Sequence, residues 1–252
     1  MKLTELNHSL ERLYQPSGFK DYIPSGLLIE GSDELSRGAT AVSFNLETIK
    51  KAVDLEAQFL VVHHGHGFWD NQSKLIKGGL KKKIELMLKH GISLFAYHLP
   101  MDAHLELGNN AGLLKALGLY RSSEFLPHGK HFIGLTGEFE VALTQDDFLE
   151  KVESSIGAVN FSFLNGTSKI KTVALCSGGA ASSIEAAKAT GADVFLTGEA
   201  KEDTSSFCMD EQFNFVAAGH YRTEVFGPQA LAEYLTNKEK IPTDFIHAPS
   251  AV

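Results

Sequence analysis

The stretch that decides the fold is LFAYHLPMDAHLELGNNAGLLKALGL, residues 94–119, taken together with FVAAGHYRTEVFGPQALAEYL, residues 215–235. Each stretch runs from an apolar strand to a histidine, three further residues, an acidic residue, a glycine and a helix. Similarity of this kind within one chain predicts a duplicated structural unit. The histidine and the acid lie four positions apart in both stretches: His98 with Asp102, and His220 with Glu224.

The strands that come before these two stretches correspond as well. FLVVHHG ends at residue 65 and VFLTGEAKED ends at residue 203, and each opens with a short apolar run. Such runs are typical of strands whose sheet is covered by helices on both faces. Ligands of open α/β sheets bind at the carboxyl ends of the strands, so we expect the histidines and acids of both units to converge on one cleft.

Strands alternate with loops and helices along the whole chain, which is typical of an α/β fold. We therefore predict two related α/β repeats, residues 1–125 and 126–252, with mixed, mostly parallel sheets and flanking helices. The metal site is expected in the cleft between the repeats. An intertwined arrangement, with the C-terminal segment packed on the first repeat, is the alternative to a clean division. Thr144 is expected to cap a helix, with Asp147 completing a capping box.

The composition excludes several classes of protein. The chain has 252 residues, 43% of them hydrophobic, and a formal net charge of −8. Nucleic acids and anionic membranes require a basic surface, so neither is expected as the main partner. Cys176 and Cys208 lack the spacing of a metal site and suggest a reducing compartment. No apolar run approaches the ~20 residues that span a bilayer, and the N-terminus does not resemble a signal peptide. We expect a cytoplasmic protein.

The adjacent histidines His63 and His64, together with the two histidine–acid pairs, predict a metal site. Imidazole and carboxylate ligands together suit Zn, Mn, Fe and Co. Neighbouring side chains in a strand point to opposite faces, so the adjacent pair is best placed at a strand end or across two metals. Five or six such ligands exceed the needs of one tetrahedral ion, whereas two ions about 3.5–4 Å apart would use them all. Glu224 or Asp102 would bridge the ions.

Other features allow a functional interpretation beside a structural one. Ser177 and the two glycines after it could cradle a phosphate, or form only a strand-to-helix turn. Glu199 could act as an acid or base, or cap a helix. Trp69 could stack on a planar ligand, or pack in a loop. Lysines 81–83 are expected on the solvated face of a helix. The histidines expected to be surface or hydrogen-bonding residues are His66, His104, His128, His131 and His247.

Four blocks of the sequence carry a resemblance to a known family: VVHHGHGFW, YHLPMDAHLELGNNAGLL, DVFLTGEAKED and AAGHYRTEVFG. In this order, from about residue 60 to residue 227, they resemble the NIF3-like family. That family is also called the dinuclear-metal-centre or GTP cyclohydrolase 1 type 2 homolog family, and the match is to its short bacterial form. The resemblance implies a dimetal site with Glu224 as the bridge and His98 as a further ligand or a residue supporting one. The implied ligands are His63, His64, Asp102, His220 and Glu224.

Two hypotheses of function follow from this resemblance. The first is a metal-dependent hydrolase that acts on a nucleotide-like small molecule, in the manner of a GTP cyclohydrolase, with His98 or Glu199 moving protons. The second is a non-catalytic protein that handles metal or regulates a partner. The resemblance also implies a ring-shaped homohexamer whose two divalent ions per subunit face an internal cavity.

Overall fold

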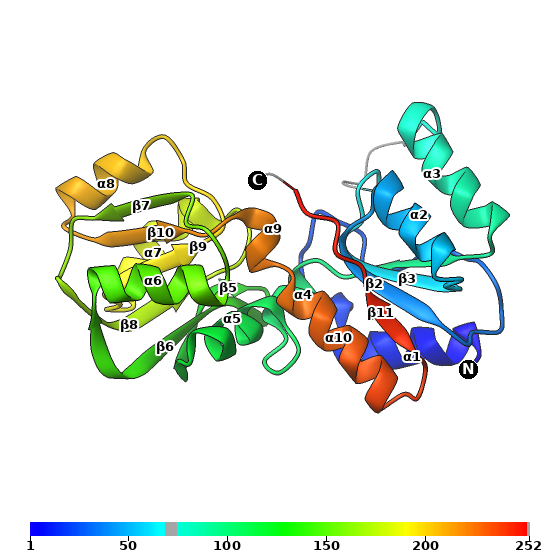
Figure 1. The fold of residues 1–252 in the computed structure, drawn as a ribbon, viewed down its shortest axis with the longest axis horizontal. Helices are drawn as coiled ribbons and strands as arrows, with labels where there is room; N and C mark the ends of the chain where they lie inside the picture. Colours follow the sequence, from blue (N-terminus) through cyan, green and yellow to red (C-terminus); the bar gives the residue numbers. More distant parts are fainter. Residues whose placement is uncertain (69–74, 251–252) are drawn as a thin grey trace. The chain divides into compact units, whose positions relative to one another are not determined.

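A computed structural model describes residues 1–68 and 75–250, which form two compact units (Figure 1). The first, here called the N-terminal unit, comprises Met1–Met101 and Gly227–Ala248. The second, here called the central unit, comprises Asp102–Phe226 and the residues from Pro249 onward. These units describe how the chain packs, and the repeat bounds, residues 1–125 and 126–252, stay a prediction.

The N-terminal unit contains a five-stranded sheet in the order β1-β4-β3-β2-β11. Strands β2, β3, β4 and β11 are parallel to one another, and β1 is antiparallel to β4. The strands are β1 Gly26–Ile29, β2 Gly38–Ser43, β3 Phe59–His64, β4 Ser93–Ala96 and β11 Thr243–Phe245. The helices are α1 Leu3–Tyr14, η1 Pro16–Gly18, α2 Leu46–Asp54 and α3 Gly78–Lys89; α4 Leu99–Ala103 and α10 Phe226–Asn237 cross its borders.

The central unit contains a six-stranded sheet in the order β5-β6-β8-β9-β10-β7. Strands β8, β9 and β10 are parallel, and the other neighbours pair antiparallel. The strands are β5 Tyr120–His128, β6 His131–Thr144, β7 Phe161–Leu164, β8 Lys169–Leu175, β9 Val194–Thr197 and β10 Asn214–Ala217. The helices are α5 Asn109–Leu117, α6 Gln145–Ser155, η2 Ala180–Ser183, α7 Ile184–Ala189, α8 Thr204–Asp210 and α9 His220–Thr223.

The duplication predicted from the sequence is visible in the order of the strands. Four strands of the first sheet, β1-β4-β3-β2, match four strands of the second, β7-β10-β9-β8. In both sets the three later strands are parallel, and the first strand in the sequence is an antiparallel neighbour of the last. The prediction of two related α/β repeats with mixed, mostly parallel sheets and flanking helices is confirmed.

The repeats exchange their last helices, which explains why the units do not divide near residue 125. Helix α5 follows β4 in the sequence but belongs to the central unit, where Leu113 and Leu117 pack with Phe148. Helix α10 follows β10 but belongs to the N-terminal unit, where Leu231 and Leu235 pack in one apolar cluster with α1. The chain therefore passes into the central unit after Met101, returns after Phe226, and enters the central unit again after Ala248.

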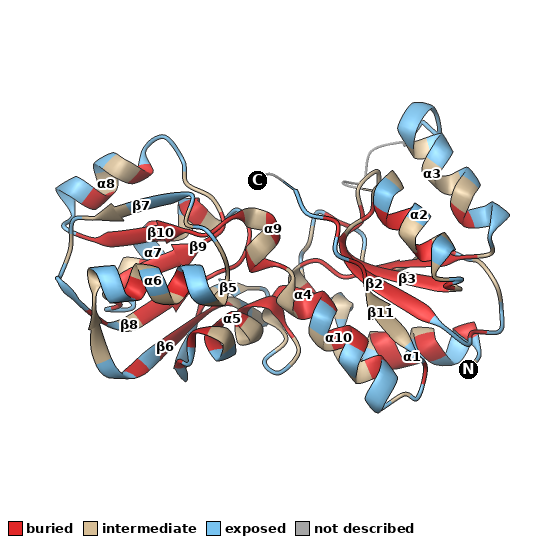
Figure 2. Cartoon of the chain, viewed as in Figure 1, coloured by how far each residue is buried: buried red, intermediate tan, exposed pale blue. Residues whose placement is uncertain are grey.

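Strand β3 shows how the apolar runs build the core of the N-terminal unit (Figure 2). All six of its residues are buried. Leu60 and Val62 pack in one cluster with residues of α2 and α3, while Phe59 and Val61 pack in a second cluster with residues of α1 and α10. Because alternate side chains point to opposite faces, a continuous apolar run supplies apolar side chains to both faces of the sheet.

The structure adds three strands that the sequence patterns did not indicate, β5, β7 and β11. All but one of the β5 residues are exposed or half-buried, so the strand has neither an apolar run nor a regular alternation. It forms because it pairs along its length with the long strand β6. The capping box at Thr144 is confirmed, with Asp147 N donating to Thr144 Oγ1 at 3.1 Å.

The sequence predicted that lysines 81–83 all lie on the solvated face of α3. The structure differs from this prediction at Lys83. Lys81 is exposed and pairs with Glu85 at 3.2 Å. Lys83 instead is half-buried and donates to the carbonyl oxygens of Phe44 and His66 at 3.1 and 2.5 Å, and burial lowers its pKa. It therefore ties α3 to the loop that follows β3.

Within residues 1–68 and 75–250, no helix combines the length and the apolar character that crossing a bilayer requires.

Candidate metal centre

Three predicted site residues of the N-terminal unit come together at the carboxyl ends of β3 and β4. His63 and His64 are the last two residues of β3, and His98 lies two residues after the end of β4. These strands are parallel neighbours, so their ends meet at the same edge of the sheet. One ring nitrogen from each histidine lies within 4.8 Å of the other two. All three residues are buried.

The two strands that flank β3 orient the adjacent histidines. His63 Nδ1 lies 3.2 Å from the backbone oxygen of Tyr97, just beyond β4. His64 Nδ1 lies 3.3 Å from Ser43 Oγ on β2. A carbonyl oxygen only accepts hydrogen bonds, so His63 carries its proton on Nδ1 and its lone pair on Nε2. The ring centroids of His63 and His64 are 4.5 Å apart.

His98 is held by an acidic residue that the sequence analysis missed, Asp21. Its Oδ2 lies 3.0 Å from His98 Nδ1 and accepts a hydrogen bond from Leu99 N, also at 3.0 Å. Burial raises the pKa of Asp21, but the hydrogen bond and charge of His98 and the backbone donors outweigh it, so the pKa is lowered. Asp21 belongs to no motif, and 77 residues separate it from His98. No signal in the sequence pointed to it.

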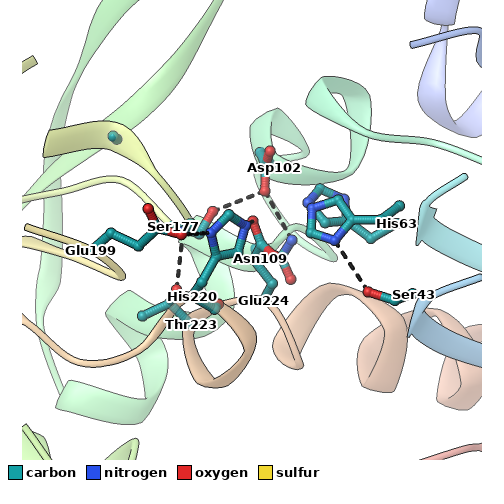
Figure 3. Close-up of polar contacts among 12 residues, drawn as sticks. Ser43, His63, Asp102, Asn109, Ser177, Glu199, His220, Thr223 and Glu224 are labelled. Atoms are coloured by element: carbon teal, nitrogen blue, oxygen red, sulfur yellow. Dashed lines mark hydrogen bonds and ion pairs between the residues drawn. The ribbon is translucent and has the colours of Figure 1, made fainter. Parts of the chain in front are cut away.

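The central unit brings together His220, Glu224 and Glu199. His220 begins the short helix α9 and Glu224 follows its end, so residues four apart lie on one side of a helical turn. His220 Nε2 is 3.1 Å from Glu224 Oε1, and its Nδ1 bonds to Glu199 (Figure 3). Burial lowers the pKa of His220, but Glu224 and then Glu199 outweigh it and raise the pKa to about 9. A positive charge is thus favoured at this position.

Asp102 is fixed by a buried network within the central unit (Figure 3). Its Oδ1 accepts hydrogen bonds from Asn109 Nδ2 at 2.9 Å and from Ser177 Oγ at 2.8 Å. Its backbone oxygen accepts from Asn110, whose own oxygen accepts from Ser177 N. The start of α5 and the loop after β8 therefore set the orientation of this carboxylate. The asparagines are part of a family block, but their role was not predicted.

The loop after β8 lies close to Glu224, in the acidic group formed by His220, Glu224 and Glu199. Gly178 has a φ of +66°, and a Cβ atom there would lie 2.2 Å from Glu224 Oε1. The N–H groups of Ser177, Gly178 and Ala180 donate to Asn110, Thr223 and Thr197 respectively. Because these donors are used within the protein, the structure favours the turn and not the phosphate cradle that was its alternative.

The remaining predicted residues are placed as follows. Glu199 contacts His220 directly, and its role as an acid or base stays a prediction. His104 lies outside the candidate metal groups of residues 1–68 and 75–250, and its Nδ1 accepts from the N–H groups of Glu106 and Leu107. Burial lowers the pKa of His104. Trp69 lies outside the described residues.

The donors present in each unit fit a divalent metal. Two ligand atoms that bind one ion at about 2.1 Å lie about 3.0–3.4 Å apart. The separation of His220 Nε2 and Glu224 Oε1, 3.1 Å, matches this spacing. The carboxylates that favour a proton on His220 would favour a cation in the same way. The three histidines of the N-terminal unit are neutral nitrogen donors of the kind that Zn, Mn, Fe and Co accept.

A family model described as Duf34/NIF3 (NGG1p interacting factor 3) matches residues 1–250. The chain belongs to the Duf34/NIF3 family. Among its relatives are proteins named GTP cyclohydrolase 1 type 2 homolog. The one from Chlamydia pneumoniae is 37% identical and that from Yersinia pestis 34% identical, and the alignments cover 98% and 99% of both chains.

Solved structures agree with this membership of the Duf34/NIF3 family. The chain is similar to protein ybgI, described as of unknown function, with a TM-score of 0.94 and 32% identity over the whole of both chains. It is also similar to TTHA1606 from Thermus thermophilus, with a TM-score of 0.90 and 30% identity, again over both whole chains. The family resemblance and the fold predicted from the sequence are thereby confirmed.

Proposed function

We propose that this Duf34/NIF3 protein binds two divalent metal ions per chain. The observation that carries the proposal is the buried group of three histidines in the N-terminal unit, with one nitrogen of each within 4.8 Å of the others. The acidic group of the central unit would supply the oxygen ligands, with Glu224 as the bridge. The proposed ligands are His63, His64, Asp102, His220 and Glu224, with His98 as a further ligand or a residue that supports one.

The path of the chain supports one shared centre for both groups. The first passage between the units falls between His98, the residue before α4, and Asp102, which lies within α4. One helical turn advances the chain by only about 5.4 Å. The second passage follows Phe226, two residues after Glu224. These two connections, unlike the third one after Ala248, lie at the histidine–acid motifs, as expected if the motif residues serve one site.

We further propose that the centre hydrolyses a nucleotide-like small molecule. Two divalent ions, when bound, supply an activated water and polarise a substrate oxygen. The chain's own residues orient the donors: Glu199 holds His220, Asp21 holds His98, and the Asn109–Ser177 network holds Asp102. The names of the relatives, GTP cyclohydrolase 1 type 2 homolog, suggest GTP as the first substrate to test.

Metal content per chain tests the centre. Elemental mass spectrometry of protein purified without chelator or nickel should find about two ions in the wild type and fewer than about one in Glu224→Ala. Glu233→Ala is the matched control, because Glu233 is an exposed glutamate on α10. We expect it to keep the wild-type content. A wild type without metal after reconstitution would remove the basis of the proposal.

Formate release from GTP tests the catalytic part. Metal-loaded wild type should exceed the background rate, and His63→Ala should not. Equal rates in the two proteins would exclude the GTP version. Two bound ions without turnover of GTP or other nucleotides would favour the non-catalytic alternative, a metal-handling or regulatory protein.

The assembly and compartment belong to the same proposal. We expect a homohexamer in the cytoplasm, as the family resemblance implies. Light scattering in solution should give six times the mass of one chain, and fractionation should find the protein in the cytoplasmic fraction. A monomeric mass at working concentration would contradict the ring.

A further inference from the structure

The candidate histidines share one feature: an oxygen atom lies at Nδ1 of each ring. The pairs are His63 with Tyr97 O, His64 with Ser43 Oγ, His98 with Asp21 and His220 with Glu199. At Nδ1, the partners of His63 and His64 are uncharged, whereas the partner of His98 is a carboxylate. That carboxylate comes from the loop before β1, outside every motif of the sequence.

The surroundings of Asp21 require an ionised carboxylate. Its Oδ1 accepts from Ile23 N at 3.1 Å, and its Oδ2 accepts from Leu99 N at 3.0 Å. His98 Nδ1 lies within 3.1 Å of both oxygens. An asparagine has one acceptor oxygen and one donor nitrogen, so it would turn an N–H group against one of these donors. Only a carboxylate satisfies all three.

The pair is also shielded from water. The side chains of Asp21 and His98 are 6% and 10% exposed. The ring of Tyr22 lies edge-on to the imidazole, with centroids 5.4 Å apart. Hydrogen bonds to an ionised acceptor are about twice as strong as neutral ones, and low exposure limits competition from solvent. The carboxylate therefore selects the tautomer and the orientation of this ring.

We propose that Asp21 is a positioning residue that keeps the proton of His98 on Nδ1, so that Nε2 offers its lone pair to the metal centre. The role of Nε2 at a metal rests on the proposed function, whereas the position of the proton does not. Carboxylates that hold the distal nitrogen of a ligand histidine support metal sites in this way, and their loss weakens the site. Asp21 would thus support the metal centre although it lies outside the histidine–acid motif from His98 to Asp102.

Nitrogen NMR of metal-free protein with ¹⁵N-labelled histidine tests the tautomer directly, at a pH where the ring is neutral. His98→Gln assigns the signals. The wild type should carry the proton on Nδ1, and in Asp21→Asn the ratio of the Nδ1–H to the Nε2–H form should fall about tenfold or more. Asp33→Asn is the matched control, an exposed aspartate of the same unit, and should leave the ratio unchanged.

A wild-type proton on Nε2, or an unchanged ratio in Asp21→Asn, would overturn the proposal. The wild-type spectrum decides the first point even if the variant does not fold. A zinc titration by calorimetry gives the second readout, with an expected loss of affinity of about tenfold or more in Asp21→Asn. A shifted tautomer with unchanged affinity would overturn the link to the metal. If the wild type bound neither zinc nor manganese, iron or cobalt, that result would instead contradict the proposed function.

Discussion

At Gly178, substitution by alanine should place a methyl group against the carboxylate of Glu224. Its φ of +66° favours glycine, and its Cβ position lies 2.2 Å from Glu224 Oε1 and 3.2 Å from His220 Nε2. We predict that Gly178→Ala loses about 1–2 kcal/mol of unfolding free energy from the backbone alone. It should also lose bound metal, because Glu224 must move. Urea unfolding and metal content per chain measure the two effects.

Gly191→Ala separates the backbone effect from the displacement of Glu224. Gly191 has a φ of +80°, and nothing lies within 4 Å of its Cβ position. The variant should show a similar loss of stability with an unchanged metal content. If Gly178→Ala kept the metal content of the wild type, Glu224 would not be needed in its present position.

At the scale of the element, the capping box of α6 makes the stability of the central unit depend on pH. Hydrogen bonds from the hydroxyl and then the backbone N–H of Thr144 lower the pKa of Asp147 below its ordinary 3.8. A lowered folded-state pKa stabilises the fold above pH 3.8, and this contribution is lost as the pH falls through the folded-state value. Asp147→Asn should therefore be less stable than wild type at pH 7, with a difference that shrinks below pH 4.

Asp146→Asn is the control for this prediction. Asp146 lies in the same first turn and is exposed, but the capping contacts with Thr144 belong to Asp147 alone. Both substitutions remove a negative charge near the helix N-terminus, whereas only one removes the cap. Urea unfolding between pH 7 and pH 3 should give a larger effect for Asp147→Asn. Equal effects would show that charge, and not the cap, is responsible.

At the scale of the whole molecule, the exchange of helices means that the two units should differ in their ability to fold alone. The central unit is formed by one continuous stretch, residues 102–226, apart from the C-terminal end of the chain. The N-terminal unit needs α10 and β11 from the end of the chain, and Leu231 and Leu235 are fully buried in its core. Each buried leucine contributes about 1.5–3 kcal/mol.

We predict that a fragment of residues 102–226 folds alone and that residues 1–101 do not. The first should unfold cooperatively in urea, and the second should gain a cooperative transition only when residues 227–248 are supplied as a separate peptide. Circular dichroism follows both. Cooperative unfolding of residues 1–101 alone would show that the returning helix and strand are dispensable for this unit.

The local features of this protein were predictable because they depend on residues near one another in the sequence. The apolar run of β3 indicates a strand covered on both faces, and the cap of α6 is set within four residues. The motif from His98 to Asp102 repeats at His220 to Glu224, which predicted the duplicated α/β unit that the structure confirms. The ligand set read from these motifs stays a proposal.

Only the tertiary structure decided the features that join distant residues. Asp21 contacts His98, which lies 77 residues later in the sequence. Helix α5 packs in the central unit, and α10 packs in the N-terminal unit. Strand β5 depends on its pairing with β6 and not on its own residues. The spacing of residues in the sequence indicates which side chains share a face of one helix or strand. It does not indicate which helices and strands bury the most apolar area against one another. That burial determines how the elements of the two repeats are combined.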